Sequence, residues 1–287
     1  YGIFYKGSLP PEDKKSIAIV GARRCSEYGR YYAKHLAELA VKAGCIIISG
    51  LAAGIDGAAH SGAMAAEGDF YGIECDIWRT RDGQYVVSHD NQMERMYGQP
   101  WKITEKTYEE IRKYPMIRGS QAVKHPPQHM VLFTGYLSIL AREETTHPVI
   151  ELKMDYTAAQ LREIVDLVKK YGLYDRTVFI SLHPQVLVRL KEELHILPEH
   201  LQYVYGATAA TKRLPVSMEL EDWLGQYGFG LDARFTLITR GTVLRLHEKG
   251  LKVNVWTVNR PEDYEKMLSF GVDYITSNYH WNGIRRS

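Results

Sequence analysis

Glu74 and Asp76 stand two residues apart in the short apolar stretch Gly72–Asp76, which has the composition of a β-strand. Side chains two residues apart on a strand point to the same face, so both carboxylates are expected on one side, with Ile73 and Cys75 on the other. Burying two carboxylates on an otherwise apolar strand costs free energy unless a positive charge compensates them. Mg²⁺ and Ca²⁺ prefer oxygen ligands, and the spacing therefore predicts a site for a hard divalent cation.

Two further segments carry groups of the same kind. Glu151 and Lys153 share a face in the stretch Val149–Lys153, and the stretch Tyr85–His89 ends in a histidine that is followed by Asp90. The plainer interpretation is a set of salt bridges at the mouth of a barrel, with Lys153 neutralising Glu151. Three strands that each deliver charged or basic groups at comparable positions favour a metal site instead, because barrel enzymes place their chemistry at the carboxyl ends of strands.

The elements that must position these groups follow an alternating pattern. Short β-branched runs alternate with longer amphipathic segments such as Ala158–Tyr171 and Thr242–Lys249, which is typical of parallel βα units. A segment rich in tyrosine, proline and charge is inserted at about residues 91–146. The chain offers nine candidate strands, one more than the usual eight-stranded barrel: Ile17–Val20, Cys45–Ser49, Gly72–Asp76, Tyr85–His89, Val149–Lys153, Thr177–Leu182, Leu201–Tyr205, Lys252–Thr257 and Asp273–Ser277.

Composition and charge limit the functional classes to which the chain is expected to belong. The 287 residues are 45% hydrophobic and 24% charged, with a formal net charge of +2, so the chain lacks the excess of positive charge that nucleic-acid binders concentrate. The longest apolar run is far too short to span a membrane. The three cysteines show no metal-type spacing and are expected to be reduced thiols, which predicts a cytoplasmic location.

The N-terminal quarter contains two glycine-punctuated turns, at Gly21-Ala22-Arg23 and at Ser49-Gly50. Each follows an apolar strand and leads toward a helix, an arrangement that can present backbone N–H groups to a phosphate; the alternative is a pair of ordinary βα turns. With Phe4-Tyr5-Lys6-Gly7 and the run from Gly50 to His60, residues 1–68 resemble the DNA-processing (DprA/Smf) family. That resemblance implies the opening two βα units of a Rossmann-like domain that binds single-stranded DNA. The later strands of such a domain are absent from the chain.

The remainder of the chain, about residues 69–282, resembles the glycerophosphodiester phosphodiesterases. The resemblance rests on spaced motifs in the family's order: Glu74-Cys75-Asp76, Thr80-Arg81-Asp82-Gly83, Val86-Val87-Ser88-His89-Asp90, Glu151-Leu152-Lys153 and Val255-Trp256-Thr257-Val258-Asn259. It implies a TIM-like (β/α) barrel in which Glu74, Asp76 and Glu151 bind Mg²⁺ or Ca²⁺. It also implies His89 as one of two general acid/base histidines and Lys153 as a phosphate contact. The implied reaction is hydrolysis of a glycerophosphodiester to glycerol phosphate and an alcohol, with no other cofactor.

One part of that pattern is missing. The family's first strand carries a His-Arg-Gly motif, and the equivalent position here, near residues 45–50, holds Cys45-Ile46-Ile47-Ile48-Ser49-Gly50 instead. The change between the two resemblances falls at Gly68-Asp69. We therefore expect a recombined, engineered chimera: a single α/β barrel over residues 1–287, made of a Rossmann-derived segment 1–68 and a phosphodiesterase-derived segment 69–287. The strand at 45–49 is expected to take the lost first position, and the strand at 17–20 would make a nine-stranded barrel or pack outside it.

Three functions remain open at this point. The first is a remnant phosphoric diester hydrolase for a small phosphodiester, with activity strongly reduced or absent because one histidine and its arginine are gone. The second is single-stranded nucleic-acid binding through the N-terminal turns, although no nucleic-acid partner is expected from the charge balance. The third is a structural test object with no selected activity, which the mismatched halves of the chain favour. An exposed edge strand near the N-terminus could support a homodimer.

Overall fold

The computed structural model describes residues 16–19, 25–42, 46–48, 72–118, 128–142 and 146–277. The chain divides into two compact units, one formed by Tyr1–Phe70 with His280–Ser287 and the other by Tyr71–Tyr279. In the first unit the described elements are a parallel strand pair, β1 (Ser16–Ala18) and β2 (Ile46–Ile48), and the helix between them, α1 (Glu27–Lys42). This is a βαβ unit in which consecutive strands pair.

The second unit is built on a nine-stranded sheet with the order β11-β10-β9-β8-β7-β6-β3-β4-β5. Seven neighbouring strands, from β11 to β3, run parallel, and the hairpin strands β4 and β5 continue the sheet antiparallel. The bounds are β3 (Gly72–Arg79), β4 (Tyr85–Val87), β5 (Val131–Leu132), β6 (His147–Leu152), β7 (Val178–Ser181), β8 (Leu201–Tyr205), β9 (Gly230–Arg234), β10 (Val253–Trp256) and β11 (Tyr274–Ile275).

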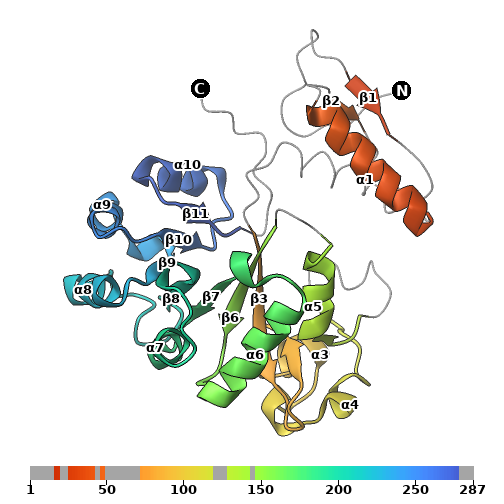
Figure 1. Cartoon of the computed structure of the whole chain (residues 1–287), viewed down its shortest axis with the longest axis horizontal. Coiled ribbons are helices and arrows are strands. Elements are labelled where there is room, and N and C mark those ends of the chain that lie inside the picture. Colours follow the sequence, from red (N-terminus) through yellow and green to blue (C-terminus); the bar gives the residue numbers. More distant parts are fainter. Residues whose placement is uncertain are drawn as a thin grey trace. The chain divides into compact units, whose positions relative to one another are not determined.

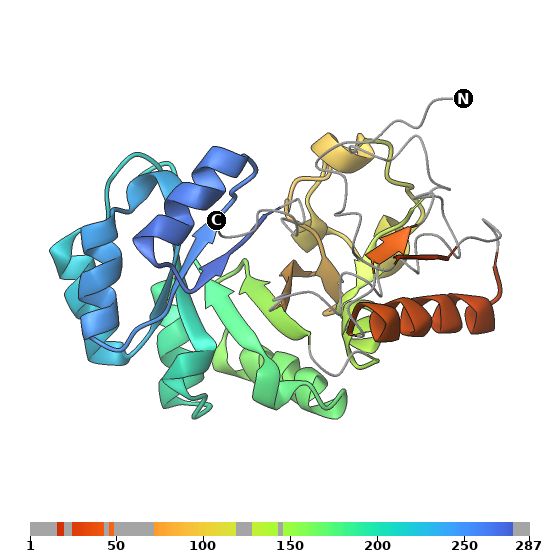
Figure 2. The same ribbon diagram turned by 90° about the horizontal axis from the view of Figure 1, so that it is seen from above.

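Helices follow the parallel strands in turn and cover one face of the sheet (Figures 1 and 2). They are α6 (Ala158–Lys170), α7 (Pro184–Glu192), α8 (Met218–Tyr227), α9 (Arg240–Glu248) and α10 (Pro261–Phe270). Their starts have local causes: Thr157 and Thr239 accept hydrogen bonds from the first turns of α6 and α9, while α7 and α10 begin with proline.

The two faces of the parallel strands differ in character. The main core lies between the sheet and the helices and contains fully buried residues such as Ile77, Ile150 and Phe179. The opposite face carries a small apolar cluster around Val178, Ile180 and Val204, together with buried polar side chains. Period-two alternation thus separates an outer apolar set from an inner polar one on the same strands.

The inserted segment builds the hairpin side of the sheet. It contains α3 (Glu94–Tyr97), the 3₁₀ turn η1 (Ile103–Glu105), α4 (Tyr108–Ile111) and α5 (Phe133–Leu140). Val86, Met93, Tyr97, Ile103, Ile111 and Met130 form its own small core. The described part of the insertion at about 91–146 is therefore folded and packed on β4.

Two expectations from the sequence need correction, and a third is not tested. The parallel strands form an open sheet among the described residues rather than a closed barrel. The strand β2 pairs with β1, and the expectation that the strand at 45–49 fills the first barrel position stays a prediction. The main sheet does have nine strands, but β5 and β9 are among them in place of the two N-terminal strands.

Within the part of the chain that the structure describes, none of the helices combines the length and apolarity needed to cross a membrane.

Candidate metal centre

The pairing of β3 with β6 brings the predicted carboxylates together. The two strands are parallel, and Asp76 stands directly opposite Glu151 in their register. Glu74 lies two residues before Asp76 on the same face of β3. One carboxylate oxygen from each of the three residues lies within 4.8 Å of the other two. The three predicted ligands therefore converge on one place.

Lys153 lies in the same cluster, just after β6. Its Nζ is 3.2 Å from Asp76 Oδ1 and 3.0 Å from Glu151 Oε1, and the lysine side chain is only 11% exposed. Although desolvation opposes the charged form, the carboxylates of Glu151 and Asp76 raise the pKa of Lys153. One ammonium thus faces two acidic groups, and Glu74 adds a third.

Burial and the neighbouring negative charges raise the pKa values of two acids in this cluster. Burial, and then the charges of Asp76 and Glu151, raise the pKa of Glu74 to about 9. Burial likewise raises the pKa of Glu151 to about 7, against the opposing effect of Lys153. Glu151 Oε1 is buried and accepts no well-oriented hydrogen bond from any described residue. An oxygen-rich, underneutralised cluster of this kind fits Mg²⁺ or Ca²⁺.

A fourth carboxylate was missed from the sequence. Asp232 on β9 is 3% exposed, and burial, followed by the charge of Glu151, raises its pKa to about 8. Asn254 on β10 donates from Nδ2 to Asp232 Oδ1 at 2.6 Å and to Thr276 Oγ1 at 3.0 Å. The alternation Gly230-Leu231-Asp232-Ala233-Arg234 was the available signal, since it puts Asp232 on one face and two apolar residues on the other.

The end of β7 and the residues just after it support Lys153 from the neighbouring strand. Ser181 Oγ donates to the carbonyl of Leu152 at 2.8 Å, and His183 Nε2 lies 3.3 Å from the carbonyl of Lys153. Sequence reasoning singled out neither residue. Both hold the backbone that carries Lys153.

His89 occupies a different environment from the acidic cluster. It follows β4, and Ser88 N donates to the carbonyl of Asp76, which ties this end of β4 to β3. The His89 side chain is 69% exposed, and its Nδ1 lies 2.6 Å from Asp90 Oδ1. Although partial burial opposes it, hydrogen bonds from Arg95 and His89 lower the pKa of Asp90. No hydrogen bond or ion pair between described residues joins His89 to the acids, so its catalytic role stays a prediction.

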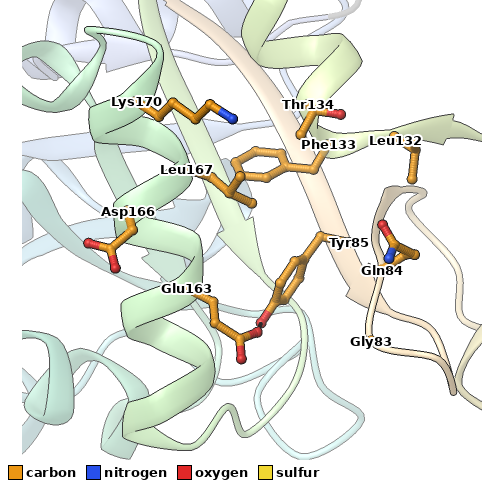
Figure 3. Close-up of a pocket in the computed structure, with 10 residues that line it drawn as sticks. All are labelled: Gly83, Gln84, Tyr85, Leu132, Phe133, Thr134, Glu163, Asp166, Leu167 and Lys170. Atoms are coloured by element: carbon orange, nitrogen blue, oxygen red, sulfur yellow. Dashed lines mark hydrogen bonds between the residues drawn. The ribbon is translucent and has the colours of Figure 1, made fainter.

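A cavity of about 460 Å³ lies beside α6 (Figure 3). Its walls come from α6, β4 and the start of α5, and the Tyr85 hydroxyl donates to Glu163 Oε2 at 2.7 Å on one side. None of the predicted site residues lines it.

Comparison with known proteins places these features in context. Residues 58–280 match the Glycerophosphoryl diester phosphodiesterase family. A glycerophosphodiester phosphodiesterase of Bacillus altitudinis is 23% identical over 231 residues, covering 77% of this chain and 85% of that protein. A short N-terminal segment behaves differently: it is 38% identical over 72 residues to the DNA processing protein DprA of Bacillus subtilis, which is 25% of this chain and 24% of that protein.

Solved structures agree with the family match. A glycerophosphodiester phosphodiesterase from Parabacteroides distasonis has a TM-score of 0.58 and 26% identity, covering 72% of this chain and 79% of that one. An Oleispira antarctica phosphodiesterase, solved with the product sn-glycerol-3-phosphate, has a TM-score of 0.64 and 17% identity, covering 76% and 86%. The fold is thus of the TIM-like (β/α) type. With its spaced motifs, parallel strands and family match in agreement, the chain belongs to the glycerophosphoryl diester phosphodiesterase family.

Proposed function

We propose that this protein is a metal-dependent hydrolase of glycerophosphodiesters whose activity is strongly reduced. The observation that carries the proposal is the convergence of Glu74, Asp76 and Glu151 within 4.8 Å, next to Lys153. The three carboxylates would hold Mg²⁺ or Ca²⁺, which when bound supplies positive charge to offset that of the phosphate oxygens. Lys153 would contact the phosphate, since its ammonium stands at the edge of the same cluster.

The reduction in rate follows from what the first-strand segment lacks. In the family pattern two histidines move protons, and only His89 matches here. General acid/base catalysis contributes roughly 10²–10⁴-fold, and activity is expected to be lower by at least that range than in a relative with both histidines. His89 is exposed and hydrogen-bonded to Asp90, which suits a group that exchanges protons with solvent.

Calcium binding provides the direct test. Calorimetric titration of the full chain with Ca²⁺ should show one site, and Glu151→Gln should weaken it by at least about tenfold, because even outer partners of a metal ligand cost 10–100-fold. Asp166→Asn, which removes an exposed carboxylate from the outer helix α6, is the matched control and should bind as the unsubstituted chain does. Equal affinity in Glu151→Gln, or no binding at all, would contradict the proposal.

Turnover is tested separately with glycerophosphocholine and Mg²⁺. The Bacillus altitudinis relative serves as the reference, and a comparable rate for this chain would show that the missing histidine is replaced by another group. A chain that binds Ca²⁺ but releases no glycerol phosphate has the metal site but lacks the hydrolase activity.

The origin of the N-terminal segment is part of the same proposal. Its likeness to a DNA processing protein, together with the family match over residues 58–280, supports a chimera whose first βα unit was exchanged. The family match begins before the junction expected at Gly68-Asp69. Single-stranded nucleic-acid binding remains a second candidate, but the turns at Gly21-Ala22-Arg23 and Ser49-Gly50 lie outside the described residues. A salt-dependent gel shift with a single-stranded oligonucleotide would support it, and none at low salt would dismiss it.

A further inference from the structure

Arg234 ends β9 and stands two residues after Asp232, so the two side chains leave the same face of the strand. That face is the inner one, where Asp232 accepts the hydrogen bond from Asn254. Arg234 is therefore one step nearer the carboxyl ends of the parallel strands than the buried acids. In barrels of this type those ends carry the chemistry.

Neighbouring strands hold the arginine in place. In the parallel register Arg234 stands opposite Trp256 on β10, and its guanidinium carbon lies 5.6 Å from the centre of the indole ring. The ring is fixed in turn, because Trp256 Nε1 donates to the carbonyl of Asp232 at 3.2 Å. On the other side, Gly206 follows β8 with φ of 90°, and a Cβ there would lie 2.9 Å from Arg234 Cβ. Glycine at 206 thus leaves room for the base of the arginine side chain, while the residue itself is exposed.

The charge of Arg234 is not used within the described structure. The ion pairs and side-chain hydrogen bonds of the described residues leave its guanidinium with only the indole contact. Lys153, by contrast, is within 3.2 Å of two carboxylates. A guanidinium offers five N–H donors in a planar fork that matches two phosphate oxygens, and stacking on an aromatic ring holds that fork ready.

The charges on the inner face indicate which kind of ligand the guanidinium of Arg234 would bind. The inner face gathers four acidic groups, Glu74, Asp76, Glu151 and Asp232, against one lysine. Lys153 and a divalent cation supply three positive charges against these acids, and a phosphodiester brings one further negative charge. An anionic substrate therefore needs a further positive group on the open side of the acids.

Resting on the proposed function, we infer that Arg234, held over Trp256, is a second phosphate-binding residue beside Lys153. It binds the non-bridging oxygens of the phosphodiester and acts mainly on affinity. Because its guanidinium already covers one face of Trp256, that face is closed to a cationic alcohol such as choline, which would otherwise make a cation–π contact there.

The test uses sn-glycerol 3-phosphate as the probe, titrated into the full chain in the presence of Ca²⁺. Loss of a charge-assisted hydrogen bond, worth about 1.5–3 kcal/mol, predicts an affinity lower by about ten- to hundredfold in Arg234→Ala. Arg234→Lys should recover part of the loss, since it restores the charge without the fork. Arg162→Ala, an exposed arginine on α6, is the matched control and should bind as the unsubstituted chain does.

The outcomes separate this inference from the proposed function. Affinity in Arg234→Ala within about twofold of the unsubstituted chain, or no binding by the unsubstituted chain at millimolar probe, overturns the role of Arg234. Arg234-dependent binding in a chain that hydrolyses nothing supports it and refutes the hydrolase. If Arg234→Ala has a lower melting temperature than Arg162→Ala, the comparison is made with Arg234→Lys instead. An Arg234→Lys affinity below that of the unsubstituted chain then supports the role of Arg234, and an equal affinity overturns it.

Discussion

Asp232 is buried among acidic neighbours, and its proton links the charge of the inner face to the stability of the fold. Its pKa in the folded chain, about 8, lies far above the ordinary value of 3.8, so the folded state binds this proton more tightly than the unfolded state. The free energy of unfolding therefore falls as pH rises from about 4 to about 8. Asp232→Asn removes the titrating group and therefore this pH dependence. Its amide oxygen still accepts the hydrogen bond from Asn254.

In metal-free buffer, Asp232→Asn should gain stability over the unsubstituted chain, and the gain should increase between pH 5 and pH 8.5. Each kcal/mol corresponds to about 2–4 °C in a domain of this size, which thermal melting resolves. Asp273→Asn is the matched control, because that carboxylate is half-buried but paired with Lys252 and His247, and it should lose stability instead. A constant difference across this pH range would show that Asp232 is ionised in the fold.

The four clustered residues could be predicted because two short-range rules suffice for them. Alternation along a strand pairs Glu74 with Asp76 and Glu151 with Lys153, and adjacent parallel strands then bring the pairs together. Asp232 could not be found this way. It is a single acid on an unrecognised strand, and its burial depends on β8 and β10 on either side.

At the scale of elements, α8 and α9 are joined by an ion pair between the buried Glu221 and the partly exposed Arg245. Arg245 donates from Nε and Nη2 to the two oxygens of Glu221, each at 2.7 Å, and Glu221 is 2% exposed. Arg245→Ala leaves this carboxylate without its partner and should lower the free energy of unfolding by about 1.5–3 kcal/mol. Arg240→Ala, at the exposed start of α9, should change it by no more than about 0.5 kcal/mol. Denaturant unfolding measures both changes. If Arg245→Ala changes the free energy of unfolding as little as Arg240→Ala does, water replaces the arginine as the partner of Glu221.

Helices were more predictable than strands for a physical reason. The pattern at 158–171 and the glycine at 250 mark α6 and the end of α9 closely, because amphipathic period and left-handed glycine caps are local signals. The strand β9 combines glycine, aspartate and arginine, which have weak strand preference, and only its neighbours make it a strand. The strand expected at 85–89 is shorter and antiparallel, since the turn at Thr80-Arg81-Asp82-Gly83 folds it back on β3.

At the scale of the whole molecule, the alternation of strands and helices predicts parallel pairing but does not fix which strands pair with each other. The strands β1 and β2 are joined by a single helix, the kind of crossover connection that a parallel pair needs. All residues of the proposed metal centre, and the whole main core, belong to the second unit.

This division leads to a test of what the N-terminal segment contributes. A chain limited to residues 71–279 keeps β3 and β6 with their six paired positions, and with them every proposed ligand. Its affinity for Ca²⁺ should stay within about threefold of that of the full chain, a difference of less than 1 kcal/mol. Glu151→Gln in the shortened chain controls for non-specific binding. Sedimentation velocity would show whether the shortened chain is monomeric. If the shortened chain is monomeric and folded but binds Ca²⁺ far more weakly, residues 1–70 complete the site, as the chimera hypothesis first required; if affinity is retained, they are dispensable to it.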